Sequence, residues 1–466
     1  MGPPSSESQM DAAHNAARAI AAGTDLNCGN GWDGKAHGYT ALPAAIEQGL
    51  ASEAQLDEVV GRSLKLRMRT GLFDPVEAQP YTRIPLEKLG AQEHHDLAEG
   101  VAAQGLVLLK NPRFLPEADD ASRQDAAILP LDRGKKTAVI GPHAHAERQL
   151  LGSYFSVACP LPARCPRVDR SCPHGSADVK CADGSGYCAL DWSCSTSPFA
   201  AISALSGGAT TSAAGCSDVS CSNRSLFPEA METAQDADQL VVVVGIDADI
   251  ECEGRDRSDT RLPGFQQELA LQLLALRKPT VVVLLNGGIV SVDQLAAPAV
   301  NCAIVEAWNP GIRGGWAIAK ALFGITNRWG KLPVTVYDSS FSESVRMVET
   351  SITSGLGRTY KYWTGPTPLF EFGHGLSLTT FALAWKGGHQ PAPVVVSSVA
   401  SAVLKLEVVV SNSGARAGDE VVMIYLASRG GCAAHLRRRP GCRTVAWSTL
   451  SASRSSRVPE RRSRSN

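Results

Sequence analysis

Three absences narrow the possible classes of this protein. No apolar run in the 466 residues approaches the ~18 residues of a membrane helix, so we expect no membrane partner. The first residues lack the basic and then apolar stretch of a signal peptide. The net charge is only −1 at pH 7, and no platform of basic and aromatic residues is present, so we expect no nucleic-acid partner. The composition, 44% hydrophobic and 20% charged, is that of a globular protein with about two to four domains.

Several catalytic and cofactor patterns are also missing. There is no G-x-G-x-x-G run, and Gly141-Pro-His143 fits a strand-end turn better than a phosphate loop. A Rossmann-type nucleotide-binding protein is therefore a disfavoured alternative. We find no Ser/His/Asp set and no close cysteine pair of the zinc-binding kind. We therefore expect neither a metal site nor a cofactor.

Cysteine is not scarce, and it is unevenly distributed. Six of the thirteen cysteines fall within 36 residues, at spacings of 6, 7, 9, 7 and 6. Their stretch is rich in Gly, Pro and Ser, which predicts a disulfide-stapled insertion at 159–200 and an oxidising compartment. Cys216 and Cys221 are a further candidate pair, and Asn223-Arg-Ser225 is a lone glycosylation sequon that points the same way. The alternative is a set of reduced cytosolic thiols.

Charge is also unevenly distributed. Residues 429–466 contain ten Arg, no Lys and one acid, whereas residues 1–428 carry a net charge of −10. Because this tail has no hydrophobic period, we expect 429–466 to be disordered and to bind polyanions at most non-specifically.

Hydrophobic periodicity predicts three folded segments before the tail. Residues 1–78 should be helical, with one helix over 12–22 and another around 56–67 that stops near Gly71. Residues 86–385 should form an α/β unit. Residues 392–428 contain two strand-like stretches joined by Asn412-Ser-Gly414. This segment is too short for a complete β-sandwich, which needs about seven strands and ~100 residues.

The α/β unit is defined by short runs of Val, Ile and Leu that alternate with helical patterns. We expect its strands at 106–110, 137–140, 239–245, 279–285 and 302–306. Its helices are expected at 94–105, 264–276 and 314–323. Continuously apolar strands alternating with helices predict a largely parallel sheet that is covered on both faces.

One acidic segment follows a predicted strand of this sheet. Ile250-Glu-Cys-Glu-Gly-Arg-Asp-Arg257 comes shortly after the strand at 239–245. Open parallel sheets bind their ligands at the carboxyl ends of strands. Crowded carboxylates suit a general acid, and either Arg255 or Arg257 could brace them. The alternative is a solvated charged loop.

A second candidate is His374, which lies between two glycines in Phe370-Glu-Phe-Gly-His-Gly-Leu-Ser377. Its small neighbours would allow it to face a ligand. A hydrogen-bonded structural histidine explains the pattern equally well.

An ordered series of segments resembles glycoside hydrolase family 3, and the match runs from about residue 11 to residue 428. The segments are Ala22-Gly-Thr-Asp-Leu-Asn-Cys-Gly29, Met68-Arg-Thr-Gly-Leu-Phe-Asp74, Gly105-Leu-Val-Leu-Leu-Lys-Asn111, Ala138-Val-Ile-Gly-Pro142, Glu251-Cys-Glu-Gly-Arg-Asp-Arg257, Leu262-Pro-Gly-Phe-Gln266 and Phe372-Gly-His-Gly-Leu376. The acid-x-acid pattern before Asp-Arg, together with the Cys-Gly loop, is similar to the β-xylosidase and α-arabinofuranosidase branch.

The resemblance implies an architecture and an activity. The architecture is the end of a (β/α)8 barrel at 1–78, an α/β sandwich at 86–385 with the insertion at 159–200, and the start of a fibronectin III-like sandwich at 392–428. The activity is retaining hydrolysis of O-glycosyl bonds in an oligosaccharide or polysaccharide, as an exo-β-1,4-xylosidase of the extracellular space or cell wall. No cofactor is implied.

The resemblance also assigns site residues. A retaining glycosidase needs two carboxyl groups about 5–5.5 Å apart, one as nucleophile and one as acid/base. The family places its acid/base in the Glu-Cys-Glu segment, and we favour Glu251 over Glu253. Asp256, Arg257 and His374 are candidate substrate-binding residues, and no metal ligand is implied.

The sequence departs from the family pattern at both ends. The family nucleophile belongs upstream of the loop at 22–29, where no such motif is found, and Asp25 matches a loop position rather than the nucleophile. We therefore expect an incomplete chain that is inactive alone. The alternative is a non-catalytic carbohydrate-binding or degenerate member of the family. Oligomeric state is not predicted.

Overall fold

The computed structural model describes most of the chain in two compact units, residues 1–91 and 92–466. The described residues are 12–27, 38–85, 88, 90–114, 127–153, 178–180, 187–189, 194–346, 348–388, 406–425 and 448–450. Most of the predicted cysteine-rich insertion lies outside them; within it, β3 (Asp178–Lys180) pairs with β4 (Tyr187–Ala189).

The described part of the first unit consists of helices, as predicted. Its elements are α1 (Ala12–Ala21), η2 (Gly38–Ala41), α2 (Leu42–Glu47), α3 (Glu53–Arg69), η3 (Val76–Ala78) and η4 (Pro80–Arg83). A capping box between Ser52 and Gln55 starts α3 and satisfies its first backbone N–H groups. A small apolar cluster, which includes Ala16, Ala45 and Val59, joins the first three α-helices. The end of α3 and the turn after it expose Leu66, Met68 and Phe73.

The second unit is built on a six-stranded sheet in the order β1-β8-β7-β6-β2-β5. Its strands are β1 (Val107–Lys110), β2 (Thr137–Ile140), β5 (Thr210–Ala213), β6 (Gln239–Gly245), β7 (Thr280–Leu285) and β8 (Ala303–Glu306). All neighbouring strands are parallel except the edge strand β1, which runs antiparallel to β8. The predicted, mainly parallel α/β sheet is therefore confirmed.

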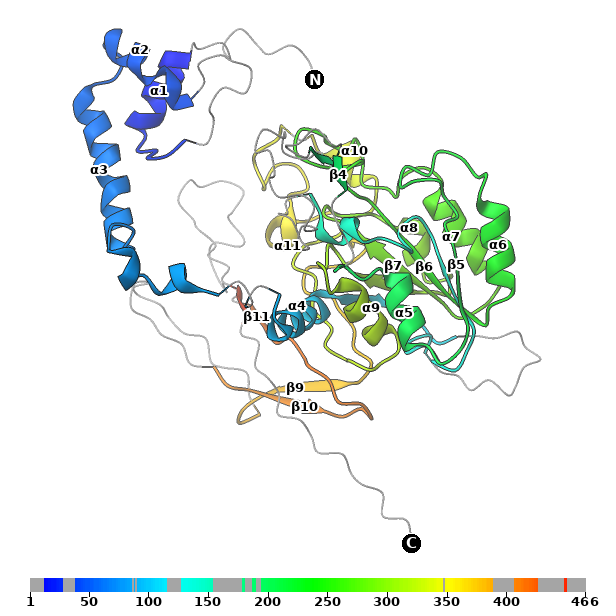
Figure 1. The fold of residues 1–466 in the computed structure, drawn as a ribbon. Coiled ribbons are helices and arrows are strands. Elements are labelled where there is room, and N and C mark those ends of the chain that lie inside the picture. Colours follow the sequence, from blue (N-terminus) through cyan, green and yellow to red (C-terminus); the bar gives the residue numbers. More distant parts are fainter. Residues whose placement is uncertain are drawn as a thin grey trace. The chain divides into compact units, whose positions relative to one another are not determined.

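Helices cover both faces of this sheet (Figure 1). Alternate residues of β6 belong to two apolar clusters, one on each face of the sheet. Val242 and Val244 are in the first cluster, and Val241 and Val243 are in the second. The first cluster contains residues of α6 (Phe227–Gln235), α7 (Gln266–Leu274) and α8 (Asp293–Ala296). The second contains residues of α4 (Gln92–Gly105), α5 (Pro198–Leu205) and α9 (Gly314–Leu322). Strands buried on both faces explain the continuous apolar runs in the sequence.

A 3-10 helix, η6 (Arg148–Leu151), two short α-helices and four C-terminal strands complete the described elements. The helices are α10 (Phe341–Ser344) and α11 (Thr359–Tyr362). β9 (Phe381–Trp385) pairs with β10 (Val408–Asn412), and β11 (Met423–Tyr425) pairs with β12 (Ser448–Leu450). The two strands expected within 392–428 therefore pair with other strands rather than with each other. Within the expected tail at 429–466, only residues 448–450 are described, and they form β12; the rest of the tail lies outside the described residues.

Disulfide bonds support part of the cysteine prediction. Cys216 and Cys221 are bonded to each other, as expected. Cys194, the last cysteine of the insertion, is also in a disulfide. Cys252 and Cys302 are free thiols.

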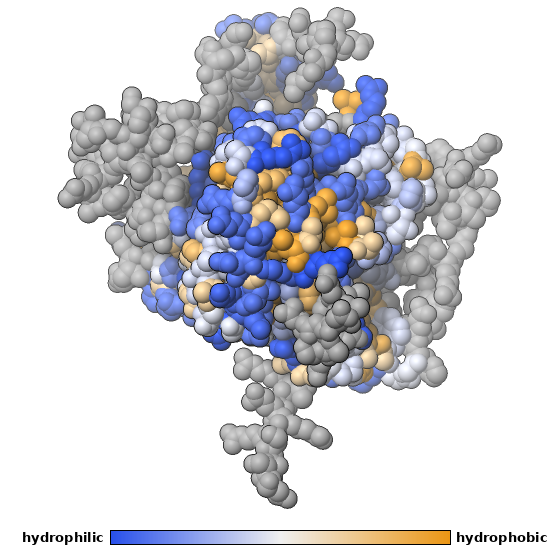
Figure 2. All heavy atoms as spheres, turned by 90° about the vertical axis from the view of Figure 1, so that its right-hand side faces the viewer, coloured by the Kyte–Doolittle hydropathy of each residue, from blue (hydrophilic) through white to orange (hydrophobic). Residues whose placement is uncertain are grey.

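The face that carries α6 and α7 is mainly hydrophilic, with an apolar band across it (Figure 2). Half-buried Met231, Phe265, Leu271 and Leu274 belong to these helices and the turn before α7.

In the described part of the chain, no helix combines the length and the apolar character that crossing a membrane requires.

Candidate active site

The chain order of the strands creates a crevice between β2 and β6. From β2 the chain passes outward to β5, and it then returns across β2 to β6 and continues to β7 and β8. The direction of winding therefore reverses between β2 and β6. Open α/β sheets bind ligands at such a reversal, outside the carboxyl ends of the strands.

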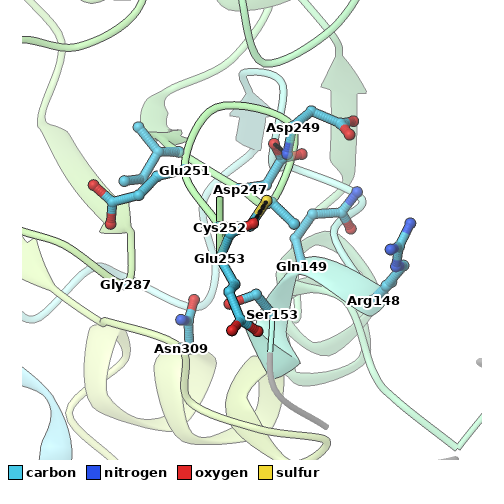
Figure 3. Close-up of a pocket in the computed structure, with 13 residues that line it drawn as sticks. Arg148, Gln149, Ser153, Asp247, Asp249, Glu251, Cys252, Glu253, Gly287 and Asn309 are labelled. Atoms are coloured by element: carbon cyan, nitrogen blue, oxygen red, sulfur yellow. Dashed lines mark hydrogen bonds between the residues drawn. The ribbon is translucent and has the colours of Figure 1, made fainter. Parts of the chain in front are cut away.

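A cavity of about 340 Å³ lies at this position. Its lining comes from the segments that follow β2, β6, β7 and β8. These residues are Arg148, Gln149, Gly152, Ser153, Ile246, Asp247, Ala248, Asp249, Glu251, Cys252, Glu253, Gly287 and Asn309. The acidic segment singled out from the sequence therefore forms one wall of the cavity, as Figure 3 shows.

The backbone of the acidic loop is fixed by short-range hydrogen bonds. The Asp247 carbonyl accepts from the N–H groups of Ile250 and Glu251, at 3.0 and 2.9 Å. Cys252 and Arg255 exchange two backbone hydrogen bonds, at 3.2 and 3.0 Å, around a turn that contains Gly254 at φ +77°. Glycine suits this left-handed conformation because it has no Cβ. The result is a tight hairpin with Glu253 at its tip.

Glu251 is held in an ion pair. The Arg257 Nε donates to Glu251 Oε2 at 2.5 Å, and Arg257 Nη2 donates to the Ile289 carbonyl at 2.9 Å. The Arg257 side chain is 12% exposed and the Glu251 side chain 32% exposed. One oxygen of the Glu251 carboxylate is thus committed to a partly desolvated guanidinium, which makes charge-assisted bonds of the stronger kind.

Glu253 lies on a different side of the hairpin. Its carboxylate points toward Ser153 and Asn309, whereas the carboxylate of Glu251 points away from them (Figure 3). Glu253 is exposed, and no ion pair or hydrogen bond to its carboxylate is found within the described residues. Both glutamates line the cavity, and of the two it is Glu251 whose carboxylate is held in an ion pair.

The surroundings of Asp247 shift the pKa of its carboxyl group upward. Burial raises the pKa of the Asp247 carboxyl, and the nearby Asp249 raises it further. Hydrogen bonds from the backbone of Asp249 and Ile250, and the charge of Arg148, act in the opposite direction. Asp247 is therefore a carboxyl group with a perturbed pKa in the wall of the cavity, and perturbed pKa values cluster at functional sites.

A buried carboxyl group that was not predicted from the sequence lies at the end of β8. Glu306 is 3% exposed, and burial raises its pKa to about 8. Its Oε1 accepts from the Trp308 N–H at 3.0 Å, and it also bonds to the Asn286 side chain. These partners lie in the turns that carry the lining residues Gly287 and Asn309. The available signal was an acid that ends an otherwise apolar strand, Ala303-Ile-Val-Glu306.

The other candidates do not line the cavity. His374 Nε2 is 2.8 Å from the Leu109 carbonyl of β1, and its ring stacks on Phe370. This arrangement fits the structural histidine that we kept as an alternative. Asp256 is exposed next to the loop. The structure thus brings together Glu251, Glu253 and Arg257, and it places His374 at another part of the sheet.

The donor groups of the cavity do not form a metal-binding cluster. Within the described residues, no group of three or more His, Cys, Asp or Glu side chains is arranged to hold a metal ion.

Comparison with known proteins assigns the family. The sequence profile of the glycosyl hydrolase family 3 C-terminal domain matches residues 106–378, which is more than half of the chain. The chain belongs to glycosyl hydrolase family 3. The family resemblance found in the sequence is thereby confirmed.

Two curated relatives and a solved structure agree with this result. Beta-D-xylosidase 1 of Arabidopsis thaliana is 33% identical over 374 residues, which are 78% of this chain and 41% of the relative. Beta-xylosidase/alpha-L-arabinofuranosidase 2 of Medicago sativa subsp. varia is 34% identical over 375 residues, with the same two coverages. The solved family 3 exo-beta-xylosidase XlnD has a TM-score of 0.66 and 27% identity over 90% of this chain and 50% of its own. The chain therefore spans less than half the length of these two curated relatives.

Gly288 permits the Glu251–Arg257 ion pair. A Cβ at this position would lie 2.3 Å from Glu251 Oε1 and 2.7 Å from Arg257 Nη2. We expect Gly288→Ala to lower the free energy of unfolding by about 1 kcal/mol, because the ends of two flexible side chains must move and their ion pair is displaced. Urea unfolding followed by circular dichroism measures this change.

The control for this prediction is Gly105→Ala, because a Cβ there would meet no atom within 4 Å. In a Glu251→Ala background the cost of Gly288→Ala should shrink, since the clashing carboxylate is gone. An equal cost in both backgrounds would show that the clash with the ion pair is not the cause.

Proposed function

We propose that this chain is the acid/base-bearing part of a retaining family 3 glycosidase that removes terminal β-1,4-linked xylosyl residues. The observation that carries the proposal is the hairpin at the sheet reversal, where Glu253 faces a cavity and Glu251 is held by Arg257. The names of the relatives support xylosides as substrates, with α-L-arabinofuranosides second.

The roles of the two glutamates follow from their contacts. In a retaining mechanism, one carboxylic acid protonates the leaving oxygen and then, as the base, activates water. Glu253 suits this role because its carboxyl group faces the cavity and is unpaired within the described residues. Glu251 suits a positioning role, since the bond to Arg257 fixes the hairpin. The sequence alone favoured Glu251 over Glu253 as the acid/base, and this assignment is the reverse.

The remaining parts of the architecture are also proposals. The helical segment at 1–78 would be the end of a (β/α)8 barrel, and the strands after residue 380 would belong to a fibronectin III-like domain. Asp256 and Arg257 would contribute to the binding of substrate through the shape of the loop. The disulfides at Cys216–Cys221 and Cys194 support an extracellular or cell-wall location. The partner would be an oligosaccharide or polysaccharide.

The 466-residue chain alone should not hydrolyse an aryl β-D-xyloside. The reason is that double displacement needs a nucleophilic carboxylate beside the acid/base, and we assign no such residue here. Release of the aryl alcohol measures activity. Turnover that disappears in Glu253→Gln or Glu251→Gln would contradict this prediction.

A hybrid protein tests the function itself. Residues 106–378 of this chain would replace the corresponding domain of beta-D-xylosidase 1 of Arabidopsis thaliana, the rest of which would supply the missing carboxylate. We expect the hybrid to hydrolyse xylobiose. A folded hybrid that binds xylose saturably but does not turn it over would favour the non-catalytic, carbohydrate-binding alternative.

A further inference from the structure

The sequon Asn223-Arg-Ser225 lies on an ordered surface loop. The loop connects β5 to α6, directly after the Cys216–Cys221 disulfide, and all three residues of the sequon are exposed. Since β5 is parallel to its neighbour β2, this loop emerges at the carboxyl edge of the sheet. The proposed glycosidase activity does not use these residues.

The side chains of the sequon form a local turn. Asn223 Oδ1 accepts from the Ser225 backbone N–H at 3.0 Å and from the Ser225 hydroxyl at 2.6 Å. Both bonds engage the amide oxygen. The amide nitrogen, Nδ2, has no hydrogen-bond partner within the described residues and lies on an exposed side chain. The reactive atom of the sequon is therefore available from solvent.

Arg224 anchors the middle of the sequon to the protein. Its Nε and Nη2 donate to the two carboxylate oxygens of Glu268 on α7, at 2.7 and 2.6 Å. Its guanidinium also lies 3.7 Å from the centre of the Phe265 ring. The middle residue thus faces the protein, and Asn223 and Ser225 face solvent on either side of it.

The disulfides provide an independent argument about the compartment. Cys216–Cys221 lies two residues before Asn223, and Cys194 is also oxidised. Disulfides form in oxidising compartments such as the endoplasmic reticulum. That compartment also contains the enzyme that glycosylates Asn-x-Ser/Thr sequons in surface loops.

We propose that Asn223 carries an N-linked glycan. In the modification, Asn223 Nδ2 forms a bond to the anomeric carbon of an oligosaccharide that is donated by a lipid pyrophosphate. The bond from that carbon to the pyrophosphate oxygen breaks, and the lipid pyrophosphate leaves with the bonding electron pair. The Nδ2 proton passes to a base of the transferase. No oxidant or reductant is needed.

The test is expression of the full chain behind a cleavable secretory leader in a eukaryotic cell. The total cell extract and the medium are both examined by intact-protein mass spectrometry, before and after treatment with peptide-N-glycosidase. We expect a glycan mass that the enzyme removes, with conversion of Asn223 to aspartate in the corresponding peptide. Asn223→Gln and Ser225→Ala should both abolish the glycan.

Matched variants separate the sequon from its surroundings. Ser222→Ala changes an exposed serine outside the sequon and should leave the glycan in place, as should Ser225→Thr, which preserves the hydroxyl. A chain whose leader is removed and whose Cys216–Cys221 bond is formed, but which carries no glycan, would overturn the proposal. A glycan that persists in Asn223→Gln would overturn it as well.

Discussion

In the hybrid glycosidase, Glu253→Gln should lower kcat for xylobiose by about 10²–10⁴-fold, the usual contribution of general acid/base catalysis. Xylobiose has a sugar hydroxyl as its leaving group, which needs a proton as the bond breaks. A dinitrophenyl β-D-xyloside has an acidic leaving group that departs without this help. The loss in the glycosylation step should therefore be much smaller for the dinitrophenyl substrate. Steady-state and burst kinetics with both substrates measure the difference.

Glu251→Gln is the matched control, since it removes the other carboxylate of the same hairpin. We expect it to weaken the bond to Arg257 and to reduce activity toward both substrates by a similar factor, because it disturbs the loop rather than removing the proton donor. If Glu251→Gln shows the dependence on the leaving group and Glu253→Gln does not, the two roles are the reverse of our proposal.

Glu306→Gln should make the stability of the protein less dependent on pH. The folded-state pKa of Glu306, about 8, lies above its ordinary value of 4.5 because the group is buried. Its stabilising contribution is therefore fully present below about pH 4.5 and is lost as pH rises through 8. The loss amounts to roughly 5 kcal/mol of unfolding free energy, an order-of-magnitude figure from a pKa difference of about 3.5 units at about 1.4 kcal/mol per unit. A neutral glutamine does not titrate, so the variant avoids this loss.

Urea unfolding at a series of pH values from about 5 to 9 measures the effect, as the difference in unfolding free energy between Glu306→Gln and the parent chain. This difference should shift in favour of the variant as pH rises. Glu229→Gln, on the exposed side of α6, removes one surface carboxylate and serves as a control for net charge. Parallel curves for the parent chain and Glu306→Gln would contradict the prediction.

The central strands of the sheet could be predicted from the sequence because their burial fills them with apolar residues. The expected strands at 137–140 and 239–245 coincide with β2 and β6. β5 could not be found in this way. It is an edge strand of sequence Thr-Thr-Ser-Ala, and strands at an edge are not selected for apolar runs. The antiparallel direction of β1 could not be predicted either, because an apolar segment does not show whether a strand is parallel or antiparallel to its neighbour.

The sequence predicted where the candidate site lies, but it could not decide the roles of its two glutamates. An acidic segment after a buried strand was enough to predict the edge of the sheet at which the cavity lies. The choice between Glu251 and Glu253 depends on Gly288 and Arg257, which lie 37 and 6 residues from Glu251 and meet it only in the folded chain. His374 shows the opposite case. Its flanking glycines suggested a ligand, whereas its nearest partner is a carbonyl 265 residues earlier.

The two edges of the sheet are protected differently, and this difference affects which associations the folded unit allows. At one edge, β1 is covered by a backbone hydrogen bond from Leu376 to the Leu108 carbonyl. At the other, β5 is only four residues long and offers mostly hydroxyl side chains. Short, polar edges are poor templates for strand addition by another molecule. We therefore expect self-association through this sheet to be suppressed even at high protein concentration.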